Sequence, residues 1–168
     1  MSVRTDAELM ATRVALHPFL AGMNQKQLAL LADCAMAVAF KKGKEIFREG
    51  QRANCCCLIE TGKVSLESTD ASGNSVVIDT IGAGDLLGWS WMFPPYEWHF
   101  TARAVEQTTA IFFHGTILRQ YCEKDHSLGY ELVKRMTAVM NRRWKARWSP
   151  RTLQPGVPTK QVVSSVIR

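Results

Sequence analysis

The segment from Gly84 to Ala104 holds the residue types that most often line a ligand-binding site. Five aromatic rings and His99 stand within eleven residues, at Trp89, Trp91, Phe93, Tyr96 and Trp98. Their apolar surface is too large to lie in water without cost, so some of the rings must fold inward. Two arrangements use the same apolar wall. The rings plug the open end of a β-barrel, or they line a pocket in which His99 is the polar contact.

Glycines and prolines shape the backbone around these rings. Gly84 and Gly88 precede the rings, and because neither has a Cβ, each allows a sharp turn or the close approach of a ligand. Pro94-Pro95 fix the backbone inside the segment. From Phe100 onward the apolar residues alternate, as they do in a strand. The sequence therefore predicts a loop on a β scaffold, which is a common place for binding residues.

Five cysteines could in principle do redox or metal chemistry, at Cys34, Cys55, Cys56, Cys57 and Cys122. Three in a row cannot form an ordinary disulfide framework, and adjacent thiols converge poorly on one metal ion. In a strand they would alternate, with Cys56 facing away from its two neighbours. We interpret them as reduced, buried apolar residues. A haem would need a His or Cys as its axial ligand, and His99 or one of Cys55–Cys57 could be nominated. The sequence does not distinguish these residues from ordinary core residues, so we expect no cofactor.

The motifs of the common enzyme classes do not occur. The sequence has no phosphate-binding loop ending in Lys-Ser/Thr, no His-Glu-x-x-His and no nucleophile elbow. Asp85 is best interpreted as a turn residue, because a catalytic carboxylate would need a partner that the sequence does not offer. We expect a binding protein without catalytic residues and without a metal.

Apolar periodicity predicts a β domain between helices. Asn24 followed by Gln27 forms a capping box, which predicts a short helix to about residue 35. Between Val38 and Phe113, apolar residues recur at every second position and glycine turns separate the runs, so we expect these apolar residues, Val76 and Ile78 among them, to be half-buried strand positions. The triplet 72–74, Ser-Gly-Asn, is a hairpin tip. Many short strands of this kind favour an antiparallel sandwich or barrel. Helices at 116–123 and about 126–148 follow.

The long helix at about 126–148 carries an apolar seam. Leu128, Leu132, Met136, Val139 and Trp144 recur at steps of three or four residues, with one step of five. Such a seam packs on another helix or on the barrel. We expect Leu132, Met136 and Val139 to be buried through self-association of this helix.

Positive charge is concentrated at the C-terminal end. Residues 126–168 hold nine Lys/Arg and one acidic residue, Glu131, whereas residues 1–125 hold 12 Lys/Arg and 14 Asp/Glu. A nucleic acid, an anionic surface or an acidic partner could use this charge, but a solvated basic helix face and tail is the simpler interpretation. No apolar run approaches the length of a membrane span, and Asp6 and Glu8 do not suit a signal peptide. We expect a cytoplasmic protein that does not contact membranes.

The order of helix, β-roll and long C-terminal helix resembles the cyclic-nucleotide-binding domain of Crp/Fnr-type bacterial regulators. Four motifs occur in that family's order: an early turn, a strand–turn–strand signature, the opening of the phosphate-binding cassette, and the strand after it. They lie at Phe47–Gly50, Leu58–Val64, Gly82–Gly88 and Thr101–Ala104, and the match covers roughly residues 17–148.

The resemblance implies an α+β, mainly β fold. It consists of an antiparallel double-stranded β-helix, that is, a jelly-roll-like β-roll at about 38–114, with short N-terminal helices and a long C-terminal helix at about 126–148. We take 1–148 as a cyclic-nucleotide-binding-like domain and 149–168 as a flexible basic tail. The resemblance also implies a small-molecule ligand, with a cyclic nucleotide as the family default, and a homodimer formed through the C-terminal helix.

The cassette departs from the nucleotide-binding members of that family. Those members use a Glu after the second cassette Gly for the ribose hydroxyl, and a later Arg for the cyclic phosphate. Here these positions fall on Trp89 and on Trp98 or His99, and an indole cannot replace the donor fork of a guanidinium. We expect cyclic AMP binding to be absent or weak and the ligand to be more apolar. The candidate ligand-binding residues are Gly88, Trp89, Ser90, Trp98, His99, Phe100 and Arg103.

Two functions stay open. The first is a stand-alone regulatory or sensor domain that signals through its C-terminal helix. The second is a ligand-free protein-interaction module whose basic helix contacts a partner or a polyanion. Regulators of this type usually carry a helix-turn-helix domain after the long helix, but residues 149–168 contain no apolar helix pair. We therefore expect no sequence-specific DNA binding.

Overall fold

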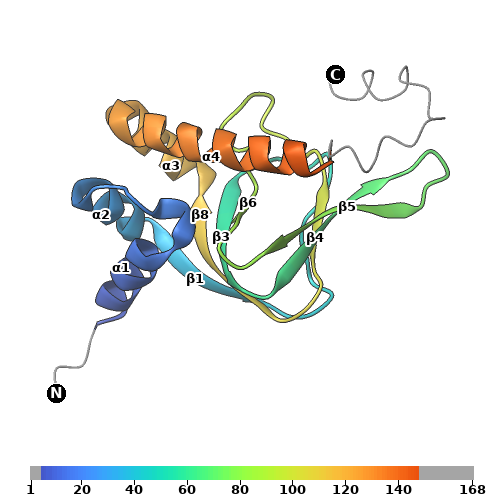
Figure 1. Ribbon diagram of the computed structural model, residues 1–168, viewed down its shortest axis with the longest axis horizontal. Coiled ribbons are helices and arrows are strands. Elements are labelled where there is room, and N and C mark those ends of the chain that lie inside the picture. The colour runs from blue at the N-terminus through green and yellow to red at the C-terminus, as the bar shows by residue number, and fades with distance from the viewer. Residues whose placement is uncertain (1–4, 148–168) are drawn as a thin grey trace. The chain divides into compact units, whose positions relative to one another are not determined.

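The computed structural model describes residues 5–147 (Figure 1). Within this range the helices lie before and after the strands in the sequence. They are α1 (Asp6–Leu16), the 3-10 helix η1 (Pro18–Leu20), α2 (Gln25–Asp33), β1 (Ala35–Phe40), β2 (Glu45–Phe47), β3 (Cys55–Thr61), β4 (Lys63–Thr69), β5 (Ser75–Gly82), β6 (Leu86–Leu87), β7 (Thr101–Ala104), β8 (Thr108–His114), α3 (Gly115–Lys124) and α4 (His126–Arg147). The expected tail at 149–168 lies outside the described residues.

Two four-stranded antiparallel sheets make up the β-roll. The first has the order β1-β8-β3-β6, and the second has the order β2-β7-β4-β5. Strands distant in sequence are neighbours in both sheets, because the chain crosses from one sheet to the other as it winds around the roll (Figure 1). The predicted fold, α+β with a jelly-roll-like β-roll between helices, is confirmed.

The central strand β3 of the first sheet is buried on both faces. Its inner face packs against the second sheet through residues such as Cys57 and Ile59, and its outer face packs against the helices through Cys56 and Leu58. Strand β3 is therefore buried at five consecutive positions, Cys55 to Ile59, and does not alternate between exposed and buried residues. As predicted, Cys56 and its neighbours point to opposite sides, but apolar groups cover both sides.

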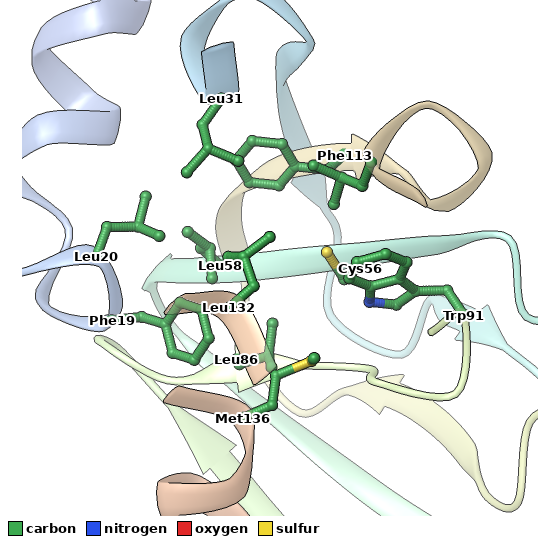
Figure 2. A pocket seen from close by; sticks show the side chains of 11 residues that line it. Phe19, Leu20, Leu31, Cys56, Leu58, Leu86, Trp91, Phe113, Leu132 and Met136 are labelled. Carbon is green, nitrogen blue, oxygen red and sulfur yellow. The ribbon is translucent and has the colours of Figure 1, made fainter. Parts of the chain in front are cut away.

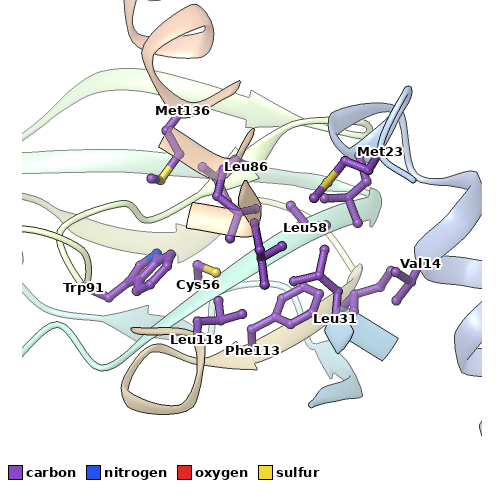
Figure 3. Packing of buried hydrophobic residues seen from close by; sticks show 14 residues of the cluster. Val14, Met23, Leu31, Cys56, Leu58, Leu86, Trp91, Phe113, Leu118 and Met136 are labelled. Carbon is purple, nitrogen blue, oxygen red and sulfur yellow. The ribbon is translucent and has the colours of Figure 1, made fainter. Parts of the chain in front are cut away.

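The helices form one apolar layer on the outer face of the first sheet. Figure 3 shows side chains from α1, α2, α3 and α4 meeting those of β3, β6 and β8 in a single cluster. The predicted capping box opens α2, where the Asn24 side chain accepts from Gln27 N and the Gln27 side chain accepts from Asn24 N. A second capping box, formed by Thr5 and Glu8, opens α1. The sequence analysis did not predict α1, although this Thr-x-x-Glu spacing is a signal that could have found it.

The β4–β5 hairpin turns at Ser72-Gly73-Asn74, as predicted. The Asp70 carboxylate closes the turn, since it accepts hydrogen bonds from the backbone N–H groups of Ser72 and Asn74. The prediction that Val76 is half-buried is wrong, because Val76 and Val77 are exposed. The hairpin extends beyond the roll (Figure 1), so the start of β5 has no second layer to pack against.

The compact unit that carries both sheets extends to Met136, within α4, and the chain from Thr137 onward belongs to a second unit. Leu132, Met136 and Val139 are buried in the single chain, and the first two contact the apolar layer described above. The expectation that self-association buries these three residues is therefore wrong. Their burial requires no second copy of the chain.

Candidate functional site

The loop between β6 and β7, residues 88–100, is held by backbone hydrogen bonds to the segment that precedes β3. Trp98 N–H donates to the Gln51 carbonyl at 2.8 Å, and Gly50 N–H donates to the Trp98 carbonyl at 2.8 Å. Ala53 N–H donates to the Tyr96 carbonyl at 2.6 Å. These bonds act like a short piece of antiparallel ladder, so they fix both the position and the direction of the Trp98 side chain.

The Trp98 indole fills the space above Gly88. It is only 4% exposed and stacks on the Phe47 ring, with 3.8 Å between ring centroids and 9° between the planes. A Cβ placed on Gly88 would lie 2.8 Å from Trp98 Cη2, and Gly88 has a φ of +86°. Gly88 thus serves two purposes here: it makes a left-handed turn, and it gives room to an aromatic ring of the protein itself.

The other predicted residues of this loop lie at different depths. Trp89 and Phe100 are half-buried against the apolar clusters, whereas Ser90 is buried and His99 is exposed. Ser90 Oγ and His99 Nδ1 lie 3.2 Å apart, within hydrogen-bonding distance. The structure thus brings Gly88 together with Trp98, and Ser90 together with His99.

Arg103 lies apart from these residues. On β7, Ala102 and Ala104 are buried inside the roll, so the alternation of the strand turns Arg103 to the outer face of the second sheet. There its guanidinium lies 3.3 Å from Glu45 Oε2 and 3.4 Å from Glu67 Oε2, and it also donates to the Gly43 carbonyl.

An open groove of about 440 Å³ surrounds Arg103. Its lining is polar and contains none of the other predicted site residues: Glu45, Arg48, Glu49, Glu67, Ser68, Thr69, Ser75, Thr101 and Arg103. The hydrogen bond from Arg48 and the charges of Arg48 and Arg103 hold the pKa of Glu45 below its usual value. The groove is lined by three glutamates and two arginines, so it is nearly balanced in charge, with one carboxylate in excess.

A small cavity lies between the first sheet and the helices, and of the five aromatic rings from Trp89 to Trp98 only Trp91 lines it. The cavity has a volume of about 20 Å³ and an almost wholly apolar wall (Figure 2), formed by Phe19, Leu20, Leu31, Cys56, Leu58, Leu86, Trp91, Phe113, Leu118, Leu132 and Met136. Trp91 is 1% exposed, and its Nε1–H has no hydrogen-bond partner among the described residues. His99 is not among the residues that line this cavity.

Trp91 is held in place from α3. The Arg119 guanidinium stacks over the Tyr96 ring, 4.4 Å from its centroid, and donates a hydrogen bond to the Trp91 carbonyl. Gly115, at the start of α3, allows the close approach, because a Cβ there would lie 2.7 Å from Trp91 Cβ. Sequence reasoning placed Trp91 in the aromatic group but gave it no separate role, and the pattern of the loop contains no signal for its depth.

The cysteines fit an apolar role. All five are free thiols. Burial raises the pKa of the Cys55 thiol to about 11 and raises that of Cys56 well above its ordinary value. Within residues 5–147, no group of three or more His, Cys, Asp or Glu side chains is placed to hold a metal ion. In the same range, no helix is long and apolar enough to cross a bilayer.

Comparison with known proteins identifies the family. The family model of the cyclic nucleotide-binding domain matches residues 37–125, which is more than half of the chain. The chain belongs to this family. A search of curated proteins finds no match.

Solved structures of cyclic nucleotide-binding domains share the fold. A protein of Geobacter metallireducens named for cyclic nucleotide binding is 26% identical, with a TM-score of 0.71 over 80% of this chain and 97% of that one. A cyclic nucleotide-binding domain from Methylobacillus flagellatus is 19% identical, with a TM-score of 0.73 over 90% and 88%. The sensor domain of the transcriptional regulator DNR from Pseudomonas aeruginosa is 16% identical, with a TM-score of 0.66 over 83% and 93%.

Proposed function

We propose that this member of the cyclic nucleotide-binding domain family is a cytoplasmic regulatory domain that responds to a small ligand other than a cyclic nucleotide. The observation that supports this proposal most directly is the position of the Trp98 ring. Its ring occupies the space above Gly88, at the opening of the cassette, and is fixed there by Phe47 and by two backbone hydrogen bonds. A ligand would have to displace a buried indole before it could approach the Gly88 backbone.

The charges of the cassette support the same proposal. Between Gly84 and Thr101 the sequence has no Arg or Lys. Arg103 already contacts Glu45 and Glu67 on the outer face of the second sheet. A cyclic phosphate bound in the cassette would therefore be removed from water without a cation to pair with it. The lost hydration would weaken binding by a free energy on the order of several kcal/mol.

We propose further that the output passes through α4 and that α4 forms a homodimer. Tyr130, Val133, Met140 and Trp144 are spaced three, seven and four residues apart, as the a and d positions of a heptad are. Their exposures lie between 37% and 66%. This exposed stripe is distinct from the buried seam of Leu132 and Met136, so a second copy could cover it without unpacking the roll.

The same position of Trp98 favours the second candidate, a ligand-free interaction module. The Trp98 side chain fills the space above Gly88, so the roll would need no ligand to be stable and could serve only as a scaffold. On that alternative, no small molecule would stabilise the domain, and the basic end of α4 would bind a partner directly.

Isothermal titration of cyclic AMP and cyclic GMP tests the proposal. We expect no measurable heat with the natural chain, and none with a Trp144→Ala control. A Trp98→Arg variant restores a guanidinium close to the position that the nucleotide-binding relatives use, and we expect it to gain weak binding. Micromolar or tighter binding by the natural chain would contradict the proposal. A thermal-shift panel of small apolar and aromatic metabolites then separates the two candidates, because only a ligand-binding domain is stabilised by mass action.

A further inference from the structure

His17 stands at the junction of α1 and η1 and is buried, with 4% of its surface exposed. Its ring makes two hydrogen bonds. Nδ1 accepts from the Phe19 backbone N–H at 3.2 Å, and Nε2 lies 2.9 Å from the Ile59 carbonyl oxygen in β3. A backbone N–H only donates and a carbonyl only accepts, so the hydrogen must be on Nε2 and Nδ1 must be bare. The two contacts together thus require an uncharged imidazole.

The carbonyl that His17 contacts also holds the opening of the cassette. Ile59 O accepts a second hydrogen bond from Gly84 N–H at 2.8 Å, and Ile59 N–H donates to the Asp85 carbonyl at 2.9 Å. Pro18, the first residue of η1, lies against the same glycine, since a Cβ on Gly84 would lie 3.5 Å from Pro18 Cγ. The imidazole therefore fastens the start of η1 to the stretch that opens the cassette.

A second proton on this ring would break the arrangement. A protonated Nδ1 is a donor, so it would face the Phe19 N–H as donor to donor and that hydrogen bond would be lost. The imidazolium would also be buried without an acceptor at Nδ1, which is costly for any charge. The closed segment therefore holds an uncharged His17, and the proton is taken up when the segment opens. Histidine is the side chain whose charge changes between about pH 5 and pH 8, so the coupling acts in the physiological range.

The charged groups around these contacts do not replace the lost acceptor. Those next to the contacts in sequence, or one helical turn away, are Arg13 on α1, Glu60 on β3 and Asp85 at the opening of the cassette. Glu60 accepts hydrogen bonds from Arg13, and this pairing raises the pKa of Arg13. Asp85 approaches Ile59 through its backbone carbonyl. An imidazolium would therefore lie beside an ion pair that is already balanced.

We infer that His17 is a pH-sensitive latch between η1 and the opening of the cassette. Above about pH 6.5 the uncharged ring holds η1 against β3. As the pH falls below that range, protons bind the open form and η1 separates from the Ile59 carbonyl. Phe19 and Leu20 of η1 line the same cavity as Leu132 of α4 (Figure 2), so release of η1 also loosens the support of that helix. This input depends on protons alone and goes beyond the proposed response to a small ligand.

Native-state hydrogen exchange at about pH 7.5 and about pH 5.5 tests the latch, expressed as protection factors so that the intrinsic effect of pH on exchange is removed. The reporters are Phe19 N–H and Gly84 N–H, which donate to the His17 ring and to the Ile59 carbonyl. We expect the protection of both to fall about tenfold, because a proton bound only by the open form shifts the opening equilibrium by up to about tenfold per pH unit below pH 6.5. Amides of β4, inside the second sheet, should keep their protection.

One variant removes the titration and another serves as its control. His17→Gln keeps an amide N–H that can donate to the Ile59 carbonyl but does not titrate in this range, so the protection of Phe19 and Gly84 should be the same at both pH values. His114→Gln removes an exposed histidine at the end of β8 and should keep the pH dependence of the natural chain.

Two results would overturn the inference: unchanged protection of Phe19 and Gly84 in the natural chain, or a fall of the same size in His17→Gln. If His17→Gln does not fold, the ¹⁵N signals of the His17 ring in the natural chain decide instead. We expect the Nε2–H tautomer at about pH 7.5, and proton uptake in acid that changes the signals of both amides. Proton uptake that leaves both amides unchanged would contradict the latch, because the closed segment would then accommodate the charge.

Discussion

The rings of Phe47 and Trp98 lie almost parallel, with centroids 3.8 Å apart, although 51 positions separate the two residues in sequence. We expect Trp98→Ala to lower the free energy of unfolding by about 3–5 kcal/mol, because it removes a buried aromatic ring. A double-mutant cycle with Phe47→Ala should give a coupling of about 0.5–1.5 kcal/mol. Urea unfolding of the four proteins measures both values, and additive losses would show that the stacking contributes nothing of its own.

Gly88→Ala should destabilise the domain for two separable reasons. The left-handed φ of +86° costs any L side chain about 1–2 kcal/mol, and the new Cβ would meet the Trp98 ring at 2.8 Å. In a Trp98→Ala background only the first cost remains, so the Gly88→Ala loss should be smaller there. Thermal unfolding of the single and double variants checks this prediction, and an equal loss in both backgrounds would contradict the contact.

Arg119→Lys should loosen the aromatic loop without unfolding the domain. Lysine keeps the charge but lacks the planar guanidinium that stacks on Tyr96 and donates to the Trp91 carbonyl. Two amides inside the loop report on this region: Met92 N–H, which donates to the Trp89 carbonyl, and Tyr96 N–H, which donates to that of Phe93. We expect these two amides to exchange faster in the variant, while amides of β3 and β8 keep their protection.

Arg103→Met should reduce stability at neutral pH and lose its effect in acid. Burial acts to raise the pKa of Glu67, but hydrogen bonds from Ser65 and Ser75 and the charge of Arg103 lower it overall. A carboxyl with a lowered pKa contributes its full stability above its unfolded pKa, and loses it as the pH falls through the folded value. We expect a loss of about 1 kcal/mol or less at pH 7, which shrinks between about pH 5 and pH 2, by urea unfolding across that range. A loss that does not change with pH would contradict this assignment.

Val133→Glu should prevent the self-association that we propose for α4 and leave the fold intact. Val133 lies in the exposed stripe of α4, whereas Met136, one turn on, is buried in the apolar layer. Met136→Glu should therefore unfold the domain, and Met36→Glu, at an exposed position of β1, should change neither property. Sedimentation velocity and circular dichroism distinguish these outcomes. An unchanged dimer in Val133→Glu would contradict the role of the stripe.

Local sequence signals predicted most of the fold. The pair Asn24 and Gln27 predicted the start of α2, and the triplet Ser72-Gly73-Asn74 predicted a hairpin tip. The alternation of apolar residues predicted the strands. These signals work because each acts within a few residues. The prediction for Val76 failed because apolar alternation does not report whether a second layer covers the strand.

The candidate site depends on contacts between residues that are far apart in the sequence, and sequence patterns do not predict such contacts. The pattern left open whether the cassette rings plug the roll or line a pocket. The structure divides the two roles: Trp98 fills the space above Gly88, and Trp91 lines a separate cavity. Which of the two tryptophans takes which role depends on Phe47 and Arg119, which lie outside the loop in sequence. For Leu132 and Met136, the periodicity predicted burial correctly but not the surface that buries them.

The run Cys55-Cys56-Cys57 places three adjacent thiols in three different apolar clusters. Cys55 packs beside Trp98, Cys56 lies under the helices, and Cys57 lies between the two sheets. A thiol reagent reaches a buried cysteine only when its surroundings open, so variants that keep one of the three would each report a different local opening. The labelling rate of each variant would then measure the frequency of one local opening: around Trp98 for Cys55, between the first sheet and the helices for Cys56, and between the two sheets for Cys57. The chain thus carries its own set of probes for comparing the motions of its layers.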